Sequence, residues 1–223
     1  MNYNQQGISF LQEGKYEEAI QAFTKAIEEN PQDEVAYINF GNVLLAVGEK
    51  DRAKAFFEKA LDLNKEAASA YYSLGNLYYE NHQFEEALHM FQQALKHGLN
   101  ESDVYFMLGM CFVQVDQTKL ALPYLQRSVE LNSNDVEARF QYGLCLAKLE
   151  YYDEAIHQLE EVIRQDDQHA DAYYNLGVAY SGHLEDVEKG IAMFEKALQI
   201  QPDHMLAGYG KKLLEKLQEN QLD

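Results

Sequence analysis

The side chains in this sequence that could bind a metal or act in catalysis are seven histidines, two cysteines and the acidic residues. A zinc site needs several ligands at short, regular spacing, and no segment shows that spacing. His82 and His89 are seven residues apart, but the repeat pattern described below places a turn between them. The sequence also lacks a glycine-rich phosphate loop and a nucleophile elbow. We therefore predict that the protein is not an enzyme and needs no metal or other cofactor.

The two cysteines, Cys111 and Cys145, lie 34 residues apart and occupy equivalent positions in a repeating pattern. Neighbouring helices pack with their axes roughly 8–10 Å apart, which is long for a disulfide. We predict that both cysteines are small, buried, apolar side chains.

The formal net charge of −19 restricts the kinds of partner. Binding to a phosphate backbone or an anionic membrane depends on Lys and Arg, so neither nucleic acid nor a membrane is an expected direct partner. The acidic residues serve solubility or favour partners with basic residues. No apolar run approaches the roughly 18 residues of a membrane span. The first residues lack the basic and apolar regions of a signal peptide, so we expect a cytoplasmic protein.

The chain is organised by a repeat of 34 residues. Glycines recur at this period at Gly7, Gly41, Gly75, Gly109, Gly143 and Gly177. Alanines follow 12 residues later at Ala19, Ala53, Ala87, Ala121 and Ala155. Large residues follow 16 residues after each glycine at Phe23, Phe57, Phe91, Leu125 and Leu159. In the sixth copy these landmarks slip by one, to Gly190 and Phe194, which indicates one inserted residue in a turn at 181–184.

This pattern has a physical reading. Small residues let two helix backbones approach closely, and large residues fill the space between them because close packing tolerates no gap. A single helix pair cannot bury its apolar face, so neighbouring pairs stack and share a core. A period of 34 residues is that of the tetratricopeptide repeat, and the chain resembles this family over nearly all of its length.

The resemblance implies an all-α fold: a right-handed tetratricopeptide (TPR) superhelical solenoid of antiparallel helix pairs. We expect one solenoid over 1–223, with repeats at about 1–33, 34–67, 68–101, 102–135, 136–169 and 170–204. The polar first helix suits an N-terminal end. A final helix from about Pro202 to Gln218 is expected to cover the last repeat. Its apolar stripe, spaced by three and four residues, consists of Leu206, Tyr209, Leu213 and Leu217.

Two residues depart from the pattern. Pro123 falls inside the second helix of repeat 4, where it removes a backbone hydrogen bond and can kink the helix. Arg139 replaces the tyrosine found at this position in most repeats. It is either an arginine whose stem packs against the protein or a charge presented beside the groove.

By resemblance to the family, the first helix of each repeat lines a concave groove. The groove-facing positions lie six and three residues before each repeat glycine and one, four and five after it. From these we select twelve peptide-binding candidates: Ile38, Asn42, Tyr72, Asn76, Tyr79, Asp103, Phe106, Met110, Glu137, Phe140, Asp171 and Tyr174. One branch of the family clamps a peptide carboxylate with Lys, Arg and Asn. Here only Asn42 and Asn76 match that clamp, which argues against it.

Tyr72, Phe106, Phe140 and Tyr174 form an aromatic row by spacing, with Asp103, Glu137 and Asp171 three residues earlier. An apolar stripe is usually core, so these rings either pack between repeats or form a binding surface. We predict a non-catalytic protein–protein interaction module or adaptor that binds an apolar peptide segment with basic residues in the groove. The alternatives are a self-assembling scaffold that uses the groove or the solenoid ends and, ranked lower, a protein that joins RNA machinery through a protein partner.

Overall fold

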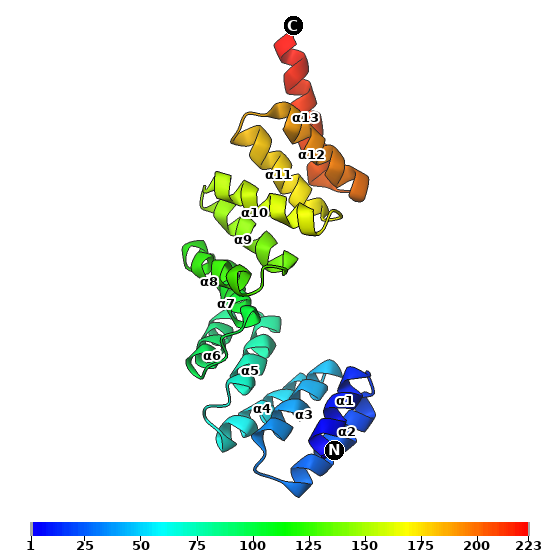
Figure 1. The fold of residues 1–223 in the computed structure, drawn as a ribbon, viewed down its shortest axis with the longest axis vertical. Coiled ribbons are helices and arrows are strands. Elements are labelled where there is room, and N and C mark those ends of the chain that lie inside the picture. Colours follow the sequence, from blue (N-terminus) through cyan, green and yellow to red (C-terminus); the bar gives the residue numbers. More distant parts are fainter. Residues whose placement is uncertain (1, 223) are drawn as a thin grey trace. The chain divides into compact units, whose positions relative to one another are not determined.

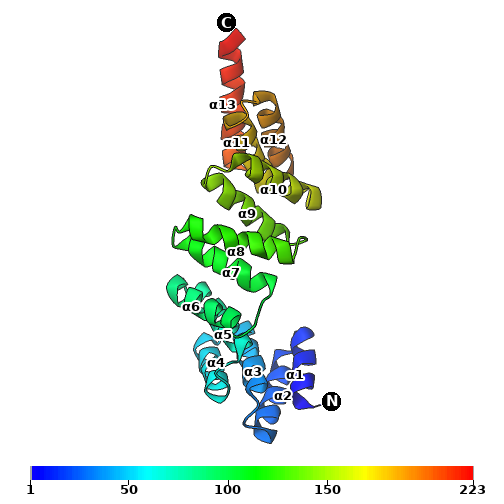
Figure 2. The same cartoon turned by 60° about the vertical axis from the view of Figure 1, so that its left-hand side comes forward.

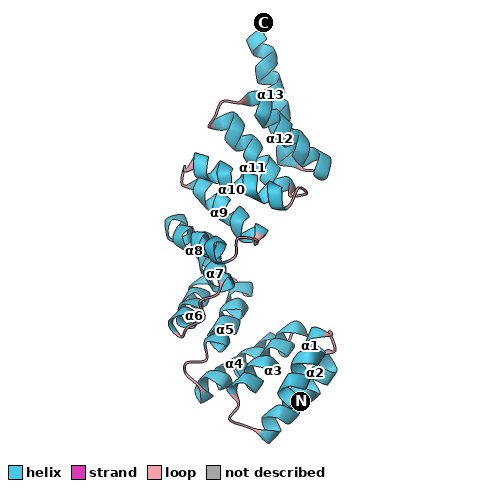
Figure 3. Ribbon diagram, in the orientation of Figure 1, coloured by secondary structure: helices cyan, strands magenta, loops and turns pink. Residues whose placement is uncertain are grey.

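The computed structural model describes residues 2–222, and these form thirteen helices without a β-strand (Figure 3). The helices are α1 (Tyr3–Gln12), α2 (Tyr16–Glu29), α3 (Glu34–Ala46), α4 (Lys50–Leu63), α5 (Ala68–Glu80), α6 (Phe84–Lys96), α7 (Ser102–Gln114), α8 (Thr118–Leu131), α9 (Val136–Lys148), α10 (Tyr152–Gln165), α11 (Ala170–Gly182), α12 (Val187–Ile200) and α13 (Met205–Leu222). Twelve helices therefore alternate as the six repeats require, and α13 follows them. The all-α prediction is confirmed.

The chain divides into two compact units, Met1–Val115 and Asp116–Asp223. In the N-terminal unit, α1 and α2, α3 and α4, and α5 and α6 form consecutive antiparallel pairs, with α7 packed on α6 (Figures 1 and 2). In the C-terminal unit, α9 and α10 form one pair and α11 and α12 another, with α8 packed on α9 and α13 on α12. Helix α8 continues through Pro123.

The repeat glycines lie where the two helices of a pair cross. A Cβ atom added to Gly75 would lie 2.6 Å from the ring of Phe91, and one added to Gly41 would lie 2.4 Å from the ring of Phe57. The same relation holds for Gly7 with Phe23 and for Gly177 with Phe194. In repeat 5 the smaller Leu159 leaves 3.2 Å at Gly143. The period of the sequence is therefore a packing period, in which an absent side chain makes room for a buried ring.

A second periodic feature lies in the backbone. The residue that follows the end of each repeat's first helix has a positive φ. These residues are Gly14, Gly48, His82, Asp116, Glu150 and Glu185. At Glu150 the motif closes the end of α9, because the N–H groups of Glu150 and Tyr151 donate to Ala147 and Leu146. Four of the six positions hold a residue other than glycine, although L-residues pay a steric cost in this conformation.

We expect Glu150→Gly to raise the free energy of unfolding by about 0.5–1 kcal/mol, since glycine adopts a positive φ without the Cβ penalty. Glu58→Gly is the matched control, because Glu58 is an exposed residue inside α4. That change should lower stability by about 0.5–1 kcal/mol. Denaturant unfolding followed by circular dichroism measures both. Two changes of the same sign would contradict the role assigned to the left-handed position.

The structure corrects two details of repeat 6 and the final helix. Ser181 and Gly182 belong to α11, so the longer turn is 183–186 rather than 181–184. The final helix begins at Met205, three residues later than expected, and continues to Leu222.

A third correction concerns how α13 packs. The residues that pack on the preceding repeat are Ala207 and Leu214, in a cluster with Phe194 and Ala197. The predicted stripe of Leu206, Tyr209, Leu213 and Leu217 faces solvent. The apolar period was recognised, but it marks the face opposite to the one that packs.

Both cysteines are free and buried, as predicted. Burial raises the pKa of the Cys111 thiol to about 12 and that of Cys145 to about 11. The Cys145 thiol donates to the carbonyl oxygen of Thr118 at 3.4 Å. Among the described helices, none combines the length and apolar character that a membrane span requires.

Candidate functional site

Four of the twelve candidates line one pocket of the N-terminal unit. The pocket has a volume of about 290 Å³ and lies among α3, α5 and the segment that leads into α7. The candidates in its wall are Asn42, Tyr72, Asn76 and Asp103. The other lining residues, which we did not select from the sequence, are Ser69, Ser73, Leu99, Glu101 and Val104. The pocket wall thus combines two amides, a phenol and two carboxylates with a few apolar side chains.

Hydrogen bonds fix the amide side of this pocket. The Ser73 hydroxyl is buried and donates to Asn42 Oδ1 at 3.0 Å, which joins α5 to α3. The Tyr72 hydroxyl and the Asn76 side chain, one helical turn apart, are also hydrogen-bonded. The Tyr72 ring packs on Phe91, with ring centroids 5.7 Å apart. Tyr72 is therefore anchored to the core on one side and presents its phenol edge to the pocket on the other.

The electrostatics of this pocket favour positive charge. Burial raises the pKa of Tyr72, and the nearby carboxylates of Asp103 and Glu101 raise it further, against a lowering effect of the bond to Asn76. Both carboxyl residues are exposed. Ionised carboxylates and amide oxygens accept hydrogen bonds, so the wall can receive several donors at once. Such a wall suits an ammonium or guanidinium group.

The remaining candidates of the N-terminal unit lie at different depths. Ile38 is only 7% exposed and belongs to the hydrophobic core. Tyr79 is half-buried, its ring meets Phe84 edge-on at 5.4 Å, and burial raises its pKa. Phe106 and Met110 on α7 are half-buried.

In the C-terminal unit, histidines pack against the aromatic candidates. Phe140 is 7% exposed, and its ring lies 4.4 Å from that of His169. Tyr174 is half-buried between Phe194 at 5.9 Å and His204 at 5.1 Å. These histidines were not selected from the sequence, because a scattered histidine carries no pattern.

Each of these histidines also accepts a backbone hydrogen bond at a helix start. His169 Nδ1 accepts from the N–H of Ala172 in α11 at 3.1 Å, and His204 Nδ1 accepts from the N–H of Ala207 in α13 at 3.2 Å. In this arrangement His204 Nε2 donates to Asp171 Oδ1 at 3.1 Å. The two rings therefore cap the helices that follow them.

The acidic candidates lie in the first turns of their helices and are exposed. Asp103 accepts from the Ser102 hydroxyl and Glu137 from the Gln141 amide, while Asp171 interacts with His204. Among the residues that the structure describes, no group of three or more His, Cys, Asp or Glu side chains could hold a metal ion.

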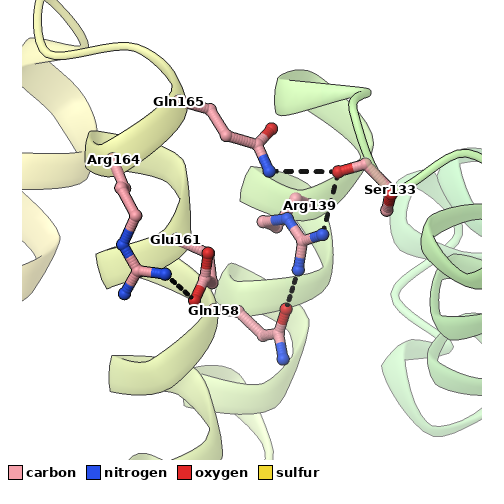
Figure 4. A network of polar contacts seen from close by, with 6 residues as sticks. All are labelled: Ser133, Arg139, Gln158, Glu161, Arg164 and Gln165. Atoms are coloured by element: carbon pink, nitrogen blue, oxygen red, sulfur yellow. Dashed lines mark hydrogen bonds and ion pairs between the residues drawn. The ribbon is translucent and has the colours of Figure 1, made fainter.

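Arg139 has a role that its sequence position explains. In repeats 2 and 3, the hydroxyls of Tyr37 and Tyr71 donate to the carbonyl oxygen six residues earlier. Arg139 makes the same link, because its Nη2 donates to the carbonyl oxygen of Ser133 at 2.9 Å (Figure 4). Its Nη1 donates to Gln158 Oε1 at 2.7 Å. The guanidinium therefore ties the loop before α9 to α10 and replaces a tyrosine of the repeat.

Figure 4 also shows the neighbours of this link on α10. Gln165 donates to the same Ser133 oxygen at 3.0 Å, so this carbonyl accepts two hydrogen bonds. Arg164 pairs with Glu161 at 2.5 Å within α10. Each polar group drawn there binds another part of the C-terminal unit.

Comparison with known proteins bears out the repeat assignment. A family model described as the C-terminal domain of cilia and flagella-associated protein 70 matches residues 3–175. A tetratricopeptide repeat model matches residues 170–204. The curated TPR repeat-containing protein YrrB of Bacillus subtilis (strain 168) is 62% identical over 39 residues, which are 18% of this chain and 19% of that protein. In that alignment, the chain spans about a fifth of its curated relative.

Solved structures extend the similarity to most of the chain. The crystal structure of YrrB, described as a TPR protein with an unusual peptide-binding site, has a TM-score of 0.81 and 53% sequence identity. The match covers 86% of this chain and 99% of YrrB. PilF of Pseudomonas aeruginosa also has a TM-score of 0.81, with 93% and 94% of the two chains covered, but at 24% identity it shows the fold alone. With its glycine–phenylalanine packing period and these matches, the chain belongs to the tetratricopeptide repeat family.

Proposed function

We propose that this protein is a non-catalytic interaction module that binds a peptide segment with apolar and basic residues. The observation that carries the proposal is the pocket of the N-terminal unit, where Asn42, Tyr72, Asn76 and Asp103 come together. The similarity to YrrB, a protein described as having a peptide-binding site, supports it at 53% identity. The remaining candidates that are at least half-exposed would extend the contact along the first helices of the repeats.

The pocket would receive a Lys or Arg side chain of the peptide. Its donors would meet the carboxylates of Asp103 and Glu101, and charge-assisted hydrogen bonds of this kind are stronger than neutral ones. The amide oxygen of Asn76 and the Tyr72 phenol lie in the same wall and can orient the rest of the group. The apolar stem of a long basic side chain would lie against Leu99 and Val104, which line the same pocket.

Selection from a random peptide library on the full chain tests this proposal. The selected peptides should be enriched in Lys or Arg flanked by apolar residues. Changing Glu101→Gln together with Asp103→Asn should weaken their binding about tenfold or more, which corresponds to about 1.4 kcal/mol or more. Tyr72→Phe keeps the ring that packs on Phe91 and should weaken binding less.

The control is Glu28→Gln with Asp51→Asn, which makes the same change in net charge at exposed positions on α2 and α4. If both double variants weaken binding equally, the pocket is not the site and the effect is one of overall charge. If no peptide is selected and light scattering shows self-association instead, the chain is a self-assembling scaffold.

A further inference from the structure

Helix α13 carries an apolar face that contacts no other part of its unit closely enough to be buried. Its members are the four residues Leu206, Tyr209, Leu213 and Leu217, here called the α13 stripe. Their exposed fractions are 60%, 70%, 47% and 47%, and Met205 at the start of the helix is 86% exposed. Large apolar side chains gathered on one exposed face mark an interaction surface rather than random exposure.

The attachment of α13 to the protein does not explain this stripe. The helix is held by its opposite face, through Ala207, Leu214 and the close approach of Gly210 to Phe194. His204 caps its first turn, and Lys211 pairs with Glu195 at 2.8 Å. A helix that only covered the last repeat would carry polar residues on its outer face. The stripe therefore has a purpose beyond covering the repeat.

The position of the stripe in the repeat shows which kind of contact it suits. Helix α13 lies where the first helix of a seventh repeat would lie, 35 residues after α11. In this register Lys212 corresponds to Gly177, which receives the ring of Phe194 in repeat 6. Lysine at that place blocks the packing of a further repeat. The stripe residues correspond instead to Asp171, Tyr174, Val178 and Gly182, the groove-facing positions of α11.

The spacing of the stripe fits a helix as its occupant. The four residues follow one another at intervals of three, four and four, as in the seam of a coiled coil. From Leu206 to Leu217 the seam extends for roughly 16 Å at 1.5 Å per residue. A second helix with apolar residues at the same spacing can pack its side chains between those of the stripe.

The charges beside the stripe define the partner further. Lys212 and Lys216 are exposed at one edge of the stripe. No ion pair to either ammonium group is found among the described side chains. In a chain with a net charge of −19, two such lysines beside an apolar seam favour acidic residues on the partner, since edge charges select partner and orientation in helix pairs.

These charges also decide against a second copy of the chain. A two-fold axis through the middle of the stripe would place Lys212 beside its own symmetry mate, and like charges in an interface are unfavourable. Each copy would also bring its net negative charge to the contact. We propose that the α13 stripe binds an amphipathic helix of another protein, whose apolar face covers the stripe and whose acidic edge meets Lys212 and Lys216.

Two synthetic helical peptides test this proposal on the full chain by fluorescence anisotropy. Both carry leucines at the spacing of the stripe, and they differ only in having glutamates or lysines along one edge. The glutamate peptide should bind at least tenfold more tightly than the lysine peptide. Leu206→Ser with Leu213→Ser should weaken its binding at least tenfold. Lys212→Glu with Lys216→Glu should reverse the preference between the two peptides.

The matched control is Leu120→Ser with Tyr151→Ser, two apolar residues with comparable exposure in the same unit, and it should leave binding unchanged. The pocket variant Glu101→Gln with Asp103→Asn should also leave it unchanged, so failure of this proposal is distinct from failure of the proposed function.

Three results would overturn the proposal. They are absent binding of the glutamate peptide, equal binding of both peptides, and a dimer in light scattering that the Leu206→Ser, Leu213→Ser variant abolishes. The same holds if α13 binds vesicles of phosphatidylcholine and phosphatidylserine while neither peptide binds.

Discussion

Replacing Phe91 with alanine is expected to lower the free energy of unfolding by about 3–5 kcal/mol, the usual cost of emptying a buried aromatic site. The ring is fully buried and fills the space that the missing side chain of Gly75 leaves between α5 and α6. Gly75→Ala is expected to cost about 1–3 kcal/mol, because its methyl group would meet the same ring at 2.6 Å and overpack the crossing. Denaturant unfolding followed by circular dichroism measures both changes.

The double variant, Gly75→Ala with Phe91→Ala, provides the sharper test. With the ring gone, the methyl group added at position 75 can enter the vacated space, so the combined cost should be smaller than the sum of the two single costs by about 0.5–3 kcal/mol. Gly182→Ala is the control, because no atom lies within 4 Å of the added Cβ at the end of α11. It should be neutral or stabilise by up to about 1 kcal/mol. Simple additivity at Gly75 and Phe91 would mean that the two sites do not share one packing space.

The packing of the repeats was predictable because it depends on residue size at a fixed period. Gly75 and Phe91 differ greatly in volume, recur together at the same spacing, and can be recognised without any knowledge of the third dimension. The positive φ at the helix ends was not predictable in the same way. Only Gly14 and Gly48 carry the residue that marks this conformation, while His82 and Glu150 adopt it because the surrounding turn demands it.

The candidate site was predictable in its register but not in its depth. The family positions placed Asn42, Tyr72 and Asp103 in the set that lines the pocket. The same positions gave Ile38 and Phe140, which neighbouring side chains cover. Whether a residue on the groove side is exposed depends on the size of its neighbours in the adjacent helices, and a single sequence does not report those contacts.

The final helix shows the limit of periodicity most clearly. A period of 3.6 residues identifies an apolar face, but it does not say what covers that face. Ala207 and Gly210 carry little apolar signal, and yet they form the contact because α13 approaches α12 and Phe194 closely there. The larger residues Leu206 and Tyr209 gave the stronger signal and point outward.

Two adjacent leucines on α13 allow this assignment to be tested within one helix. Leu214 is 8% exposed and packs in the cluster around Phe194, whereas Leu213 belongs to the α13 stripe. Leu214→Ala should lower the stability of the last repeat by about 2–5 kcal/mol through the lost contacts and the cavity left behind. Leu213→Ala should change it by no more than about 0.5 kcal/mol, as is usual for surface substitutions.

Hydrogen exchange of the amides of α12 and α13 measures the two effects where they arise, because the outer repeats of a solenoid can open locally. Faster exchange in both helices is expected for Leu214→Ala, with the wild-type pattern for Leu213→Ala. The same chemical change at neighbouring positions controls for helix propensity, so any difference reports packing alone. Equal loss of protection in the two variants would mean that Leu213 also packs against the protein, and the α13 stripe would then be core rather than a surface for a partner helix.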